Sequence, residues 1–529
     1  MNLNFVVIHI IIKYCIFVKQ IRKDNKNMSI KDIQNISYDT FLKDFKSTLK
    51  SVFYEKDDIQ KFSQLRGFPS LVFRDIMAKK PLSVAVPKEF GGRGMKVKEC
   101  LGVLEAASYE SLPLSLTFGI NIALFLEPVA KYAKQDAKAP IFNRFLNERN
   151  MGGLMITEPS YGSDALSMET SNTFNNGKYH IKGQKHWQGL TGLADYWLIT
   201  SRKKGEDGRL GRDIDFFIAD NQDSEQRVIV EEYYNNAGLY AIPYGNNKLD
   251  LKVPENQKLV PGSTGIKLML DLLHRSRMQF PGMAMGFIKR MMDEAIEHCN
   301  QRIVSGKNLL ALDKVREQIS SIQAAFTVCS AMCTRSSEHS GIENELAMDQ
   351  VEANSMKSVI TDMMQAASQT LVQLSGSSGY KAENIGARGI MDSRAFMIFE
   401  GSNEMLYTQI SEAVMKLMKR KKITNLFDFL ATYNLTTKSA DFFKENLNFN
   451  LNMDLPQRKM VDLGKIIGRV VSANFVVDMG AKGFRADLVS ECLISLKHEI
   501  TASVSSLTFQ ESTNLITDYK QDSTWLNLV

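Results

Sequence analysis

Cysteine is scarce in this chain, with six among 529 residues. So few thiols in so long a chain do not form a disulfide scaffold, which indicates a reducing compartment and predicts a cytoplasmic location. Cys329 and Cys333 are one helical turn apart with His339 nearby, but a zinc site needs more ligands at better spacing. We therefore expect buried core thiols and no bound metal.

A basic face is also lacking. The net charge is +6, and residues 1–27 contribute +4 of it, since they hold five Lys or Arg residues against one Asp. A nucleic-acid-binding protein needs clustered positive charge, so nucleic acid is not expected as a partner. No G-x-G-x-x-G follows a predicted strand, which argues against a nicotinamide-binding fold.

Long hydrophobic runs are few. Phe5–Val18 is apolar, but His9 and Lys13 interrupt it and the basic residues follow it. It fits neither a secretory signal nor a membrane-spanning helix of about 20 residues. Met28 opens a soluble-looking sequence, so a misassigned start codon is our preferred interpretation of residues 1–27, with a weak membrane anchor as the alternative. We expect no other stretch to be long and apolar enough to span a bilayer.

The remaining chain, in a sequence that is 44% apolar, is long enough for several domains. Residues 28–152 have helical periodicity, as in Phe41, Phe45 and Leu49. Residues 153–265 contain short strand-like runs without helices between them, which predicts a compact antiparallel β-domain. These runs are Lys178–Lys185, Tyr196–Arg202, Asp213–Ala219 and Arg227–Glu232.

Residues 266–423 predict an antiparallel four-helix bundle, which makes the fold class mainly α with a central β-domain. Its amphipathic runs are Leu268–Asn308, Asp313–Arg335, Glu345–Gly376 and Met405–Lys421. Gly282 and Gly286 form a G-x-x-x-G pattern that indicates close helix packing. Residues 424–529 predict a helical extension, with helix-like runs at Arg458–Met479 and Leu488–Leu507 after Pro456.

One acid stands out just before the last bundle helix. Glu400 follows Met397, Ile398 and Phe399, and apolar neighbours of this kind would desolvate its carboxylate and raise the pKa toward a range useful for abstracting a proton. Alternatively, Glu400 only marks a helix start, where the helix dipole stabilises a negative charge. The segment by itself leaves both interpretations open.

Five segments in order resemble the acyl-CoA dehydrogenase family of flavoenzymes, over roughly residues 40–423. Met155–Asp164 resembles T-E-P-G-A-G-S-D, Gly183–Trp187 resembles N-G-x-K-x-W, Gln373–Tyr380 resembles Q-x-x-G-G-x-G-F, and Phe399–Ser402 resembles Y-E-G-T, while Arg277 falls where an arginine begins the first bundle helix. The resemblance implies an N-terminal helical domain, a β-domain and a four-helix bundle, and the last hundred residues resemble the helical extension of larger members.

The resemblance also implies bound FAD between the β-domain and the bundle. The cofactor-binding residues it implies are Met155, Ile156, Thr157, Gly162, Ser163, Trp187, Gln188, Gly189, Arg302, Gln373, Gly376, Ser402 and Glu404. Of these, Arg302, Gln373 and Gly376 would contact the FAD of a neighbouring subunit. For the acyl-CoA substrate it implies Ser163, His274, Arg277 and Gly401.

By resemblance, Glu400 is the catalytic base. It would remove the α-proton of a fatty acyl-CoA thioester while flavin N5 takes the β-hydride, giving a trans-2-enoyl-CoA. Hydrogen bonds from the Glu400 backbone N–H and a flavin hydroxyl would stabilise the enolate. Some members place the glutamate where Ser276 stands here, and serine cannot serve as that base. The resemblance further implies electron-transfer flavoprotein or a similar electron acceptor, and a homo-oligomer in which the extension favours a dimer.

Several departures leave the substrate and the electron acceptor open. The family's W-I-T or W-I-S is Trp187-Gln188-Gly189 here, so the hydroxyl expected near flavin N5 is absent. His274 stands in place of an acidic residue, Met391 in place of an arginine and Ser305 in place of a phenylalanine. An acyl-CoA oxidase or flavin hydroxylase on the same fold, or a non-catalytic scaffold, therefore remain as alternatives.

Overall fold

The computed structural model describes residues 30–56, 67–521 and 523–529, so the expectations for residues 1–27 lie outside the described residues. The N-terminal part is helical. Its α-helices are α2 (Ile30–Asn35), α3 (Tyr38–Lys50), α5 (Ser70–Met77), α6 (Val97–Glu110), α7 (Leu112–Asn121), α8 (Glu127–Tyr132) and α9 (Gln135–Glu148). On α3, the side chains of Phe41, Phe45 and Leu49 recur at one-turn spacing and all three are buried, as their periodicity predicts.

A π-helical turn, Ile122–Leu126, joins α7 to α8. Together they form one continuous run, Leu112–Tyr132, that is long and apolar enough to cross a membrane, so the expectation that no such stretch follows the N-terminus is wrong. However, 89% of its most apolar window is buried inside the protein. Core helices of soluble proteins meet the same criterion.

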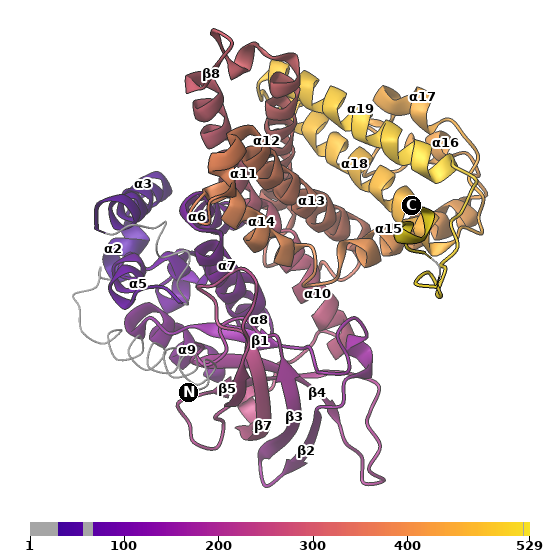
Figure 1. The fold of residues 1–529 in the computed structure, drawn as a ribbon. Helices are drawn as coiled ribbons and strands as arrows, with labels where there is room; N and C mark the ends of the chain where they lie inside the picture. The colour runs from indigo at the N-terminus through magenta and orange to yellow at the C-terminus, as the bar shows by residue number, and fades with distance from the viewer. Residues whose placement is uncertain (1–29, 57–66, 522) are drawn as a thin grey trace.

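The β-domain is one seven-stranded sheet (Figure 1). Its strands are β1 (Gly152–Met155), β2 (Ser171–Asn175), β3 (Lys178–His186), β4 (Tyr196–Lys203), β5 (Asp215–Asp220), β6 (Ile229–Tyr233) and β7 (Gly245–Pro254). The order is β1-β4-β2-β3-β7-β6, with β5 paired to β4. The sheet is mixed and not purely antiparallel, because β4 pairs in parallel with both β1 and β2.

The bundle contains more helices than the four runs expected. They are α10 (Gly265–Arg277), α11 (Phe280–Gln301), α12 (Asp313–His339), α13 (Gln350–Ser375), α14 (Ile385–Phe396) and α15 (Asn403–Lys421). The first expected helix is broken after Arg277, and Pro281 lies in the first turn of α11, where proline is well tolerated. A short hairpin of β8 (Ile303–Val304) and β9 (Lys307–Asn308) follows α11.

The glycine pair on α11 permits close contact with α6. A Cβ atom at Gly282 would lie 2.9 Å from a side-chain atom of Leu101, and one at Gly286 would lie 2.0 Å from the carbonyl oxygen of Glu105. Any larger side chain at Gly286 would therefore push the helices apart. The close helix packing expected from this pattern is confirmed.

The described cysteines are core residues. Cys100, Cys299, Cys329 and Cys492 are buried, Cys333 is half-buried, and all five are free thiols.

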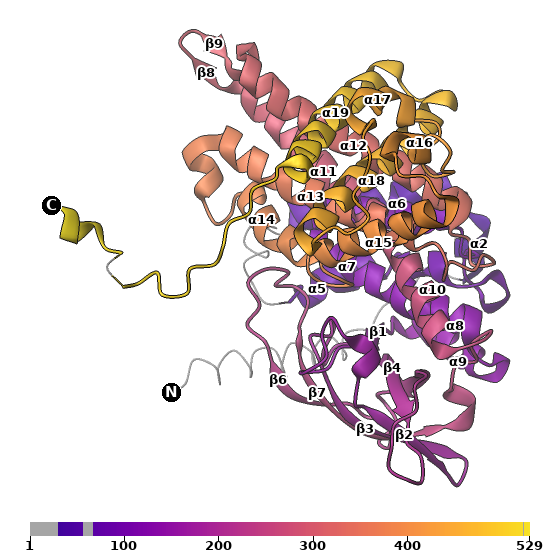
Figure 2. The same cartoon turned by 90° about the vertical axis from the view of Figure 1, so that its right-hand side faces the viewer.

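The C-terminal extension contains α16 (Leu426–Leu430), α17 (Lys444–Leu447), α18 (Gln457–Ala481) and α19 (Ala486–Thr508). Helix α18 packs against α12, α13 and α15, and α19 packs against α12 and α18. In Figure 1 these helices, in yellow, lie beside the bundle on the side away from the sheet. The segment after α19 extends away from the body, as Figure 2 shows.

Candidate active site

Glu400 lies in a tight turn between α14 and α15. Its φ is +54° and that of Gly401 is +96°, so two successive residues have left-handed backbone. Ser402, not Glu400, caps the N-terminus of α15, because its side chain accepts a hydrogen bond from the Met405 N–H at 3.4 Å. The alternative in which Glu400 only marks the helix start therefore does not describe this turn.

Arg277, the last residue of α10, holds the turn in place. Its Nη2 and Nε donate to the carbonyl oxygen of Glu400 at 2.7 and 3.2 Å, and its Nη1 donates to Asn354 Oδ1 at 2.7 Å. The side chain is buried, and burial lowers the pKa of Arg277 to about 10 while Glu400 opposes that change. In this structure Arg277 thus binds the backbone of the base, whereas the sequence-based expectation was a contact with substrate.

The two carboxylate oxygens of Glu400 differ. Ser276 Oγ donates to Oε1 at 2.9 Å, while Oε2 is buried and has no hydrogen-bond partner. Burial raises the pKa of the Glu400 carboxyl, and Arg277, the Ser276 hydrogen bond and Lys357 oppose the rise. One oxygen is therefore fixed in position and the other is available to accept a proton.

Lys357, on α13, is a member of the site that sequence reasoning missed. Its fully buried Nζ donates to the Gly401 carbonyl oxygen at 2.7 Å and to Asn403 Oδ1 at 2.9 Å. Burial, together with Arg277, lowers the pKa of Lys357 to about 7, and Glu400 opposes this shift. The available signal was a lone lysine in a helical run whose neighbours are otherwise apolar, small or neutral (Ala353–Thr361).

Aromatic rings surround the chain just before the base. The Phe280, Phe396 and Phe399 ring centroids lie 5.0 to 5.9 Å from one another. Ile398, by contrast, is 59% exposed, so the expectation that it shields the carboxylate is wrong. The apolar side chains next to this turn therefore come from Phe280 on α11 and Phe396 on α14, as well as from Phe399.

On the β-domain side, Trp187 presents a large aromatic surface. It has a φ of +60°, and its ring lies 4.6 Å from the ring of Tyr234 and 6.1 Å from that of Tyr244. Even so, 52% of the residue is exposed. Trp187 follows the end of β3 and its side chain is exposed, so its ring offers a flat surface against which another flat ring system can stack.

The loop that follows β1 rests on a buried ion pair. Lys185 Nζ lies 2.9 Å from Glu158 Oε1 and also donates to the Ile156 carbonyl oxygen at 2.8 Å. Burial lowers the pKa of Lys185 to about 8, and Glu158 opposes the shift. The Thr157 carbonyl oxygen accepts from the side chain of Gln188 at 3.2 Å. The ion pair therefore fixes the loop from beneath, next to Trp187.

The other expected site residues fall into three groups by their exposure. Buried ones are Met155, Gln188 and His274; Ile156, Thr157, Gly401 and Ser402 are half-buried; and Gly162, Ser163, Arg302, Gln373, Gly376 and Glu404 are exposed. Gly189 leaves no room for a side chain, since a Cβ would lie 2.7 Å from Ile120. Arg302 begins the β8–β9 hairpin, which projects from the body in Figure 2, so it is not brought together with Glu400 in one chain.

His274 is neutral inside the protein. Its Nδ1–H donates to the Leu346 carbonyl oxygen at 2.8 Å, and burial, together with Arg277, lowers the pKa of His274 to about 4. In the unfolded chain the pKa is about 6.5. Between these values the unfolded state binds one more proton, so the free energy of unfolding falls by about 3 kcal/mol as the pH drops from roughly 6.5 to 4.

This predicts a specific change in the His274→Asn variant, whose amide keeps a donor for Leu346 but does not titrate. Urea unfolding of the variant is expected to lose less stability between pH 7 and pH 4.5 than unfolding of the wild type. Parallel loss in both proteins would show that His274 is not the titrating group.

Three family models match consecutive parts of the chain. The N-terminal domain of acyl-CoA dehydrogenase matches residues 48–149, its middle domain residues 153–250 and its C-terminal domain residues 263–415. Together with the observed fold and the buried Glu400, the three matches define the class of the protein as a flavin-dependent oxidoreductase built from three domains. The chain belongs to the acyl-CoA dehydrogenase family.

Similar proteins have low identity to this chain. An acyl-CoA dehydrogenase of Bacillus subtilis is 23% identical over 350 residues, 65% of this chain and 89% of that protein. The very long-chain specific acyl-CoA dehydrogenase of Rattus norvegicus mitochondria is 23% identical over 372 residues, 69% of this chain and 56% of that protein. The chain thus spans little more than half the length of the very long-chain relative.

Solved structures share the fold. An acyl-CoA dehydrogenase from Bacillus anthracis, complexed with FAD, covers 92% of this chain and 91% of its own at 16% identity, with a TM-score of 0.73. Butyryl-CoA dehydrogenase from Megasphaera elsdenii covers 74% of this chain and all of its own at 21% identity, with a TM-score of 0.62. The predicted fold class is confirmed.

FAD is the cofactor of this family, and the Bacillus anthracis structure contains it. The residues present here fit a flavin. Trp187 exposes an aromatic face beside two tyrosines, the loop at Ile156 and Thr157 is fixed by a buried ion pair, and Glu400 keeps one carboxylate oxygen buried and unpartnered.

Proposed function

We propose that this protein catalyses the α,β-dehydrogenation of a fatty acyl-CoA thioester to a trans-2-enoyl-CoA, with Glu400 as the base. The observation that carries the proposal is the state of its carboxylate. Oε1 accepts a hydrogen bond from Ser276, and Oε2 is buried without a partner. A carboxylate that is held firmly but incompletely hydrogen-bonded suits proton abstraction.

The pKa of the base matters because the α-proton of a thioester is weakly acidic. Burial raises the pKa of Glu400, which makes its carboxylate a stronger base than one in water. Arg277, the Ser276 hydrogen bond and Lys357 limit the rise, which favours the ionised form of the carboxyl. The surrounding cations therefore tune the base and do not neutralise it by direct ion pairs.

The turn can also stabilise the negative charge that develops on the thioester oxygen. The Glu400 N–H has no backbone acceptor among the described residues. Because Arg277 fixes the Glu400 carbonyl and Lys357 fixes the next one, the peptide groups of the turn are held rigidly. We assign the Glu400 N–H as a donor to the thioester oxygen. Bound FAD supplies the acceptor for the hydrogen that leaves the β-carbon.

The cofactor residues implied by the resemblance remain part of this proposal, with Trp187 as the platform for the flavin ring. Arg302, Gln373 and Gly376 are exposed, and we propose that they serve the FAD of a second subunit in a homodimer. Electron-transfer flavoprotein, or a similar acceptor, is proposed to reoxidise the flavin, and the cytoplasm is the proposed location.

The purified protein is expected to be yellow, and its flavin absorbance is expected to bleach when an acyl-CoA is added under anaerobic conditions. The visible absorbance of the oxidised flavin measures this directly. Rapid reoxidation in air with release of hydrogen peroxide would instead indicate an acyl-CoA oxidase. A colourless protein that takes up no FAD would indicate a scaffold and contradict the proposal.

A further inference from the structure

A series of buried polar contacts leads from the turn at Glu400 toward the C-terminal extension. It begins at Asn403, the first residue of α15, which is buried. The Asn403 Oδ1 accepts a hydrogen bond from Lys357 Nζ at 2.9 Å, and its Nδ2 donates to Asp362 Oδ1 at 2.7 Å. The other carboxylate oxygen, Asp362 Oδ2, accepts from the Tyr407 hydroxyl at 2.7 Å. Asp362 therefore joins the residue that holds Lys357 to the next turn of α15.

The orientation of the Asn403 amide depends on these two neighbours. An ammonium group only donates hydrogen bonds and a carboxylate only accepts them, so the amide satisfies both only with its oxygen toward Lys357 and its nitrogen toward Asp362. A reversed amide would make two donors face each other inside the protein, and unpaired buried polar groups are costly. Asp362 thus fixes the amide that holds Lys357, and Lys357 in turn donates to the Gly401 carbonyl oxygen at 2.7 Å.

The extension packs closely against α15 at Tyr407. On α18, a Cβ at Gly464 would lie 2.1 Å from the Tyr407 carbonyl oxygen, and one at Gly468 would lie 3.6 Å from the Tyr407 ring. The two glycines are one helical turn apart and share a face of α18. Figure 1 shows α15 and α18 side by side. This close packing brings Arg469, the residue after Gly468, within electrostatic range of the Tyr407 side chain.

Arg469 supplies a buried positive charge at this point. Its Nε donates to Glu499 Oε2 on α19 at 2.6 Å, and its guanidinium also interacts electrostatically with Tyr407 and Asp362. Burial alone would lower the pKa of Arg469, but Tyr407, Glu499 and Asp362 raise it above its ordinary value. The guanidinium therefore stays charged, and a cation of the extension interacts with Asp362.

The charged groups alternate in sign along this path. From the extension to the base they are, in order, Glu499, Arg469, Asp362, Lys357 and Glu400. Burial and Arg277 lower the pKa of Lys357. The acids that oppose this shift are Glu400, Asp362 and Glu404. Because opposite charges stabilise each other's ionised form, a change at one member of the series alters the next.

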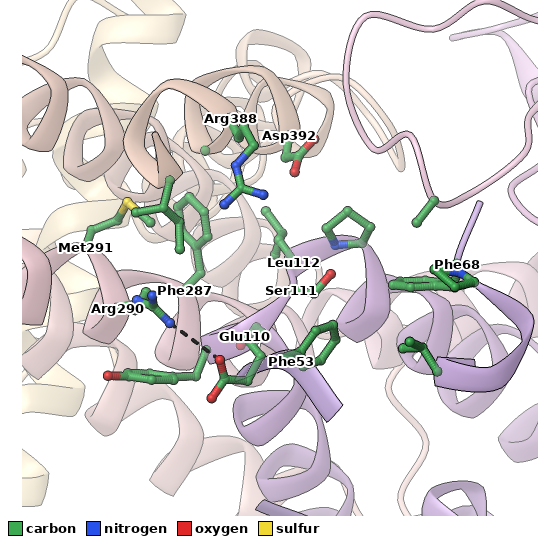
Figure 3. Close-up of a pocket in the computed structure, with 18 residues that line it drawn as sticks. Phe53, Phe68, Glu110, Ser111, Leu112, Phe287, Arg290, Met291, Arg388 and Asp392 are labelled. Atoms are coloured by element: carbon green, nitrogen blue, oxygen red, sulfur yellow. Dashed lines mark hydrogen bonds and ion pairs between the residues drawn. The ribbon is translucent and has the colours of Figure 1, made fainter. Parts of the chain in front are cut away.

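A buried ion pair elsewhere has no such connection to the base. Arg290 on α11 lies beside Glu110 on α6, with 3.4 Å between Nη1 and Oε2, at a pocket between the N-terminal helices and the bundle (Figure 3). In the part of the chain that the structure describes, the other hydrogen bonds of Arg290 go to Tyr54 and Glu294. No hydrogen bond leads on from these partners to the turn at Glu400. Burial of an ion pair is therefore not enough to connect it to the base.

We propose that Arg469, on the C-terminal extension, is a positioning residue for the base Glu400. Its charge holds the Asp362 carboxylate in place, and this carboxylate orients the Asn403 amide. The oriented amide then keeps Lys357 against the turn. This inference rests on the proposed function, in which Glu400 removes the proton. It also goes beyond that function, because the matched family domains end at residue 415 and Arg469 lies outside them.

Replacing Arg469 by methionine removes the charge and keeps much of the length of the side chain. The half-buried Asp362 carboxylate then loses its cation and is expected to turn toward water, which releases the Asn403 amide and removes a negative charge from beside Lys357. Lys357 becomes harder to protonate, so the pKa of Glu400 rises. In the holoenzyme, the pH profile of anaerobic flavin reduction, with the acyl-CoA that bleaches the wild type fastest, is expected to move toward alkaline pH by about half a unit. Below the pKa of Glu400 the variant is then up to about threefold slower than the wild type.

Two further variants separate positioning from simple packing. Arg469→Lys keeps the charge and is expected to keep the wild-type profile. Lys482→Met is the matched control, because it breaks another ion pair between the extension and the bundle, at 2.7 Å from Glu338 on α12, and it is also expected to keep the profile. A shift of equal size in Arg469→Lys and Arg469→Met, or a shift in Lys482→Met, would show that the extension acts only through packing and would overturn the assignment.

Asp362→Asn tests the same path without changing the extension. It is expected to shift the profile in the same direction, and adding Arg469→Met to it is expected to produce no further shift, because both act through one carboxylate. Additive shifts, or an unchanged profile in Asp362→Asn, overturn the assignment. Infrared titration of the Glu400 carboxyl, with Glu400→Gln as the blank, follows the same pKa without turnover. A wild type whose flavin no acyl-CoA reduces would reject the proposed function, while the infrared shift would still test the role of Arg469.

Discussion

Replacing Glu400 by glutamine is expected to leave FAD bound and to slow the reduction of flavin by acyl-CoA about a thousandfold, the range over which a general base acts. Glutamine has nearly the shape of glutamate. Its amide oxygen can still accept the Ser276 hydroxyl, and the contacts of Arg277 and Lys357 with the turn go to backbone carbonyls that the variant retains. The loss should therefore lie in the chemical step.

Stopped-flow bleaching of the flavin under anaerobic conditions measures this rate, and FAD content and the thermal midpoint are measured alongside. Glu412→Gln is the matched control, since Glu412 is an exposed acid further along α15, and this variant is expected to be reduced at the wild-type rate. If Glu400→Gln bleached as fast as the wild type, another group would be the base. A variant that lost its FAD would instead show that Glu400 supports the cofactor site.

The sequence predicted a buried helix face where apolar or small residues recur at one-turn spacing along the helix. The spacing of Phe41, Phe45 and Leu49 gave the buried face of α3, and the glycine pair on α11 gave its contact with α6. The break after Arg277 was missed, because the run Leu268–Asn308 was expected to be one helix, although Pro281 is typical of a first helical turn. Strand β7 was missed although its residues alternate between buried and exposed, since Asn and Lys on its outward face resemble a loop.

Other features depend on contacts between distant segments. The parallel pairing of β4 with β1 and β2 is set by long connections that carry no local signal. In the site, the sequence indicated a desolvated acid at position 400 but not the left-handed backbone of the turn, which Arg277 and Lys357 stabilise from other helices. From the sequence alone, Ser276 was only a residue that cannot act as the base. The fold makes it the hydrogen-bond donor to that base.

Replacing Lys357 by methionine is expected to reduce activity at low pH much more than at high pH. Methionine keeps the length of the side chain but removes its charge and its hydrogen bonds to Gly401 and Asn403. Burial lowers the pKa of Lys357 to about 7, so the wild-type side chain is charged mainly below neutral pH. There it opposes the rise in the pKa of Glu400. Without it that pKa rises further, by about one unit for an opposite charge a few ångströms away.

The sign of the effect follows from the form of Glu400 that reacts. Only the carboxylate accepts a proton, so the rate of flavin reduction rises with pH through the pKa of Glu400, and a higher pKa moves this rise toward alkaline pH. At a pH below the pKa of Glu400 in both proteins, the variant is expected to be up to about tenfold slower than the wild type, the ratio that one pKa unit produces, in addition to any pH-independent loss. At pH 9 the two rates are expected to differ only by the effect of the lost hydrogen bonds.

The measurement is the pH profile of anaerobic flavin reduction in three proteins: wild type, Lys357→Met and the control Lys416→Met, which removes an exposed charge from α15. The control profile is expected to match the wild type. A loss of equal size at pH 6 and pH 9 in Lys357→Met would mean that Lys357 only supports the turn. Infrared absorption of the Glu400 carboxyl, identified by comparison with Glu400→Gln, reports the same pKa without turnover, because the protonated and ionised groups absorb at different frequencies. A shift in that titration together with the rate profile would establish that a buried cation beneath the turn sets the pH at which the base ionises.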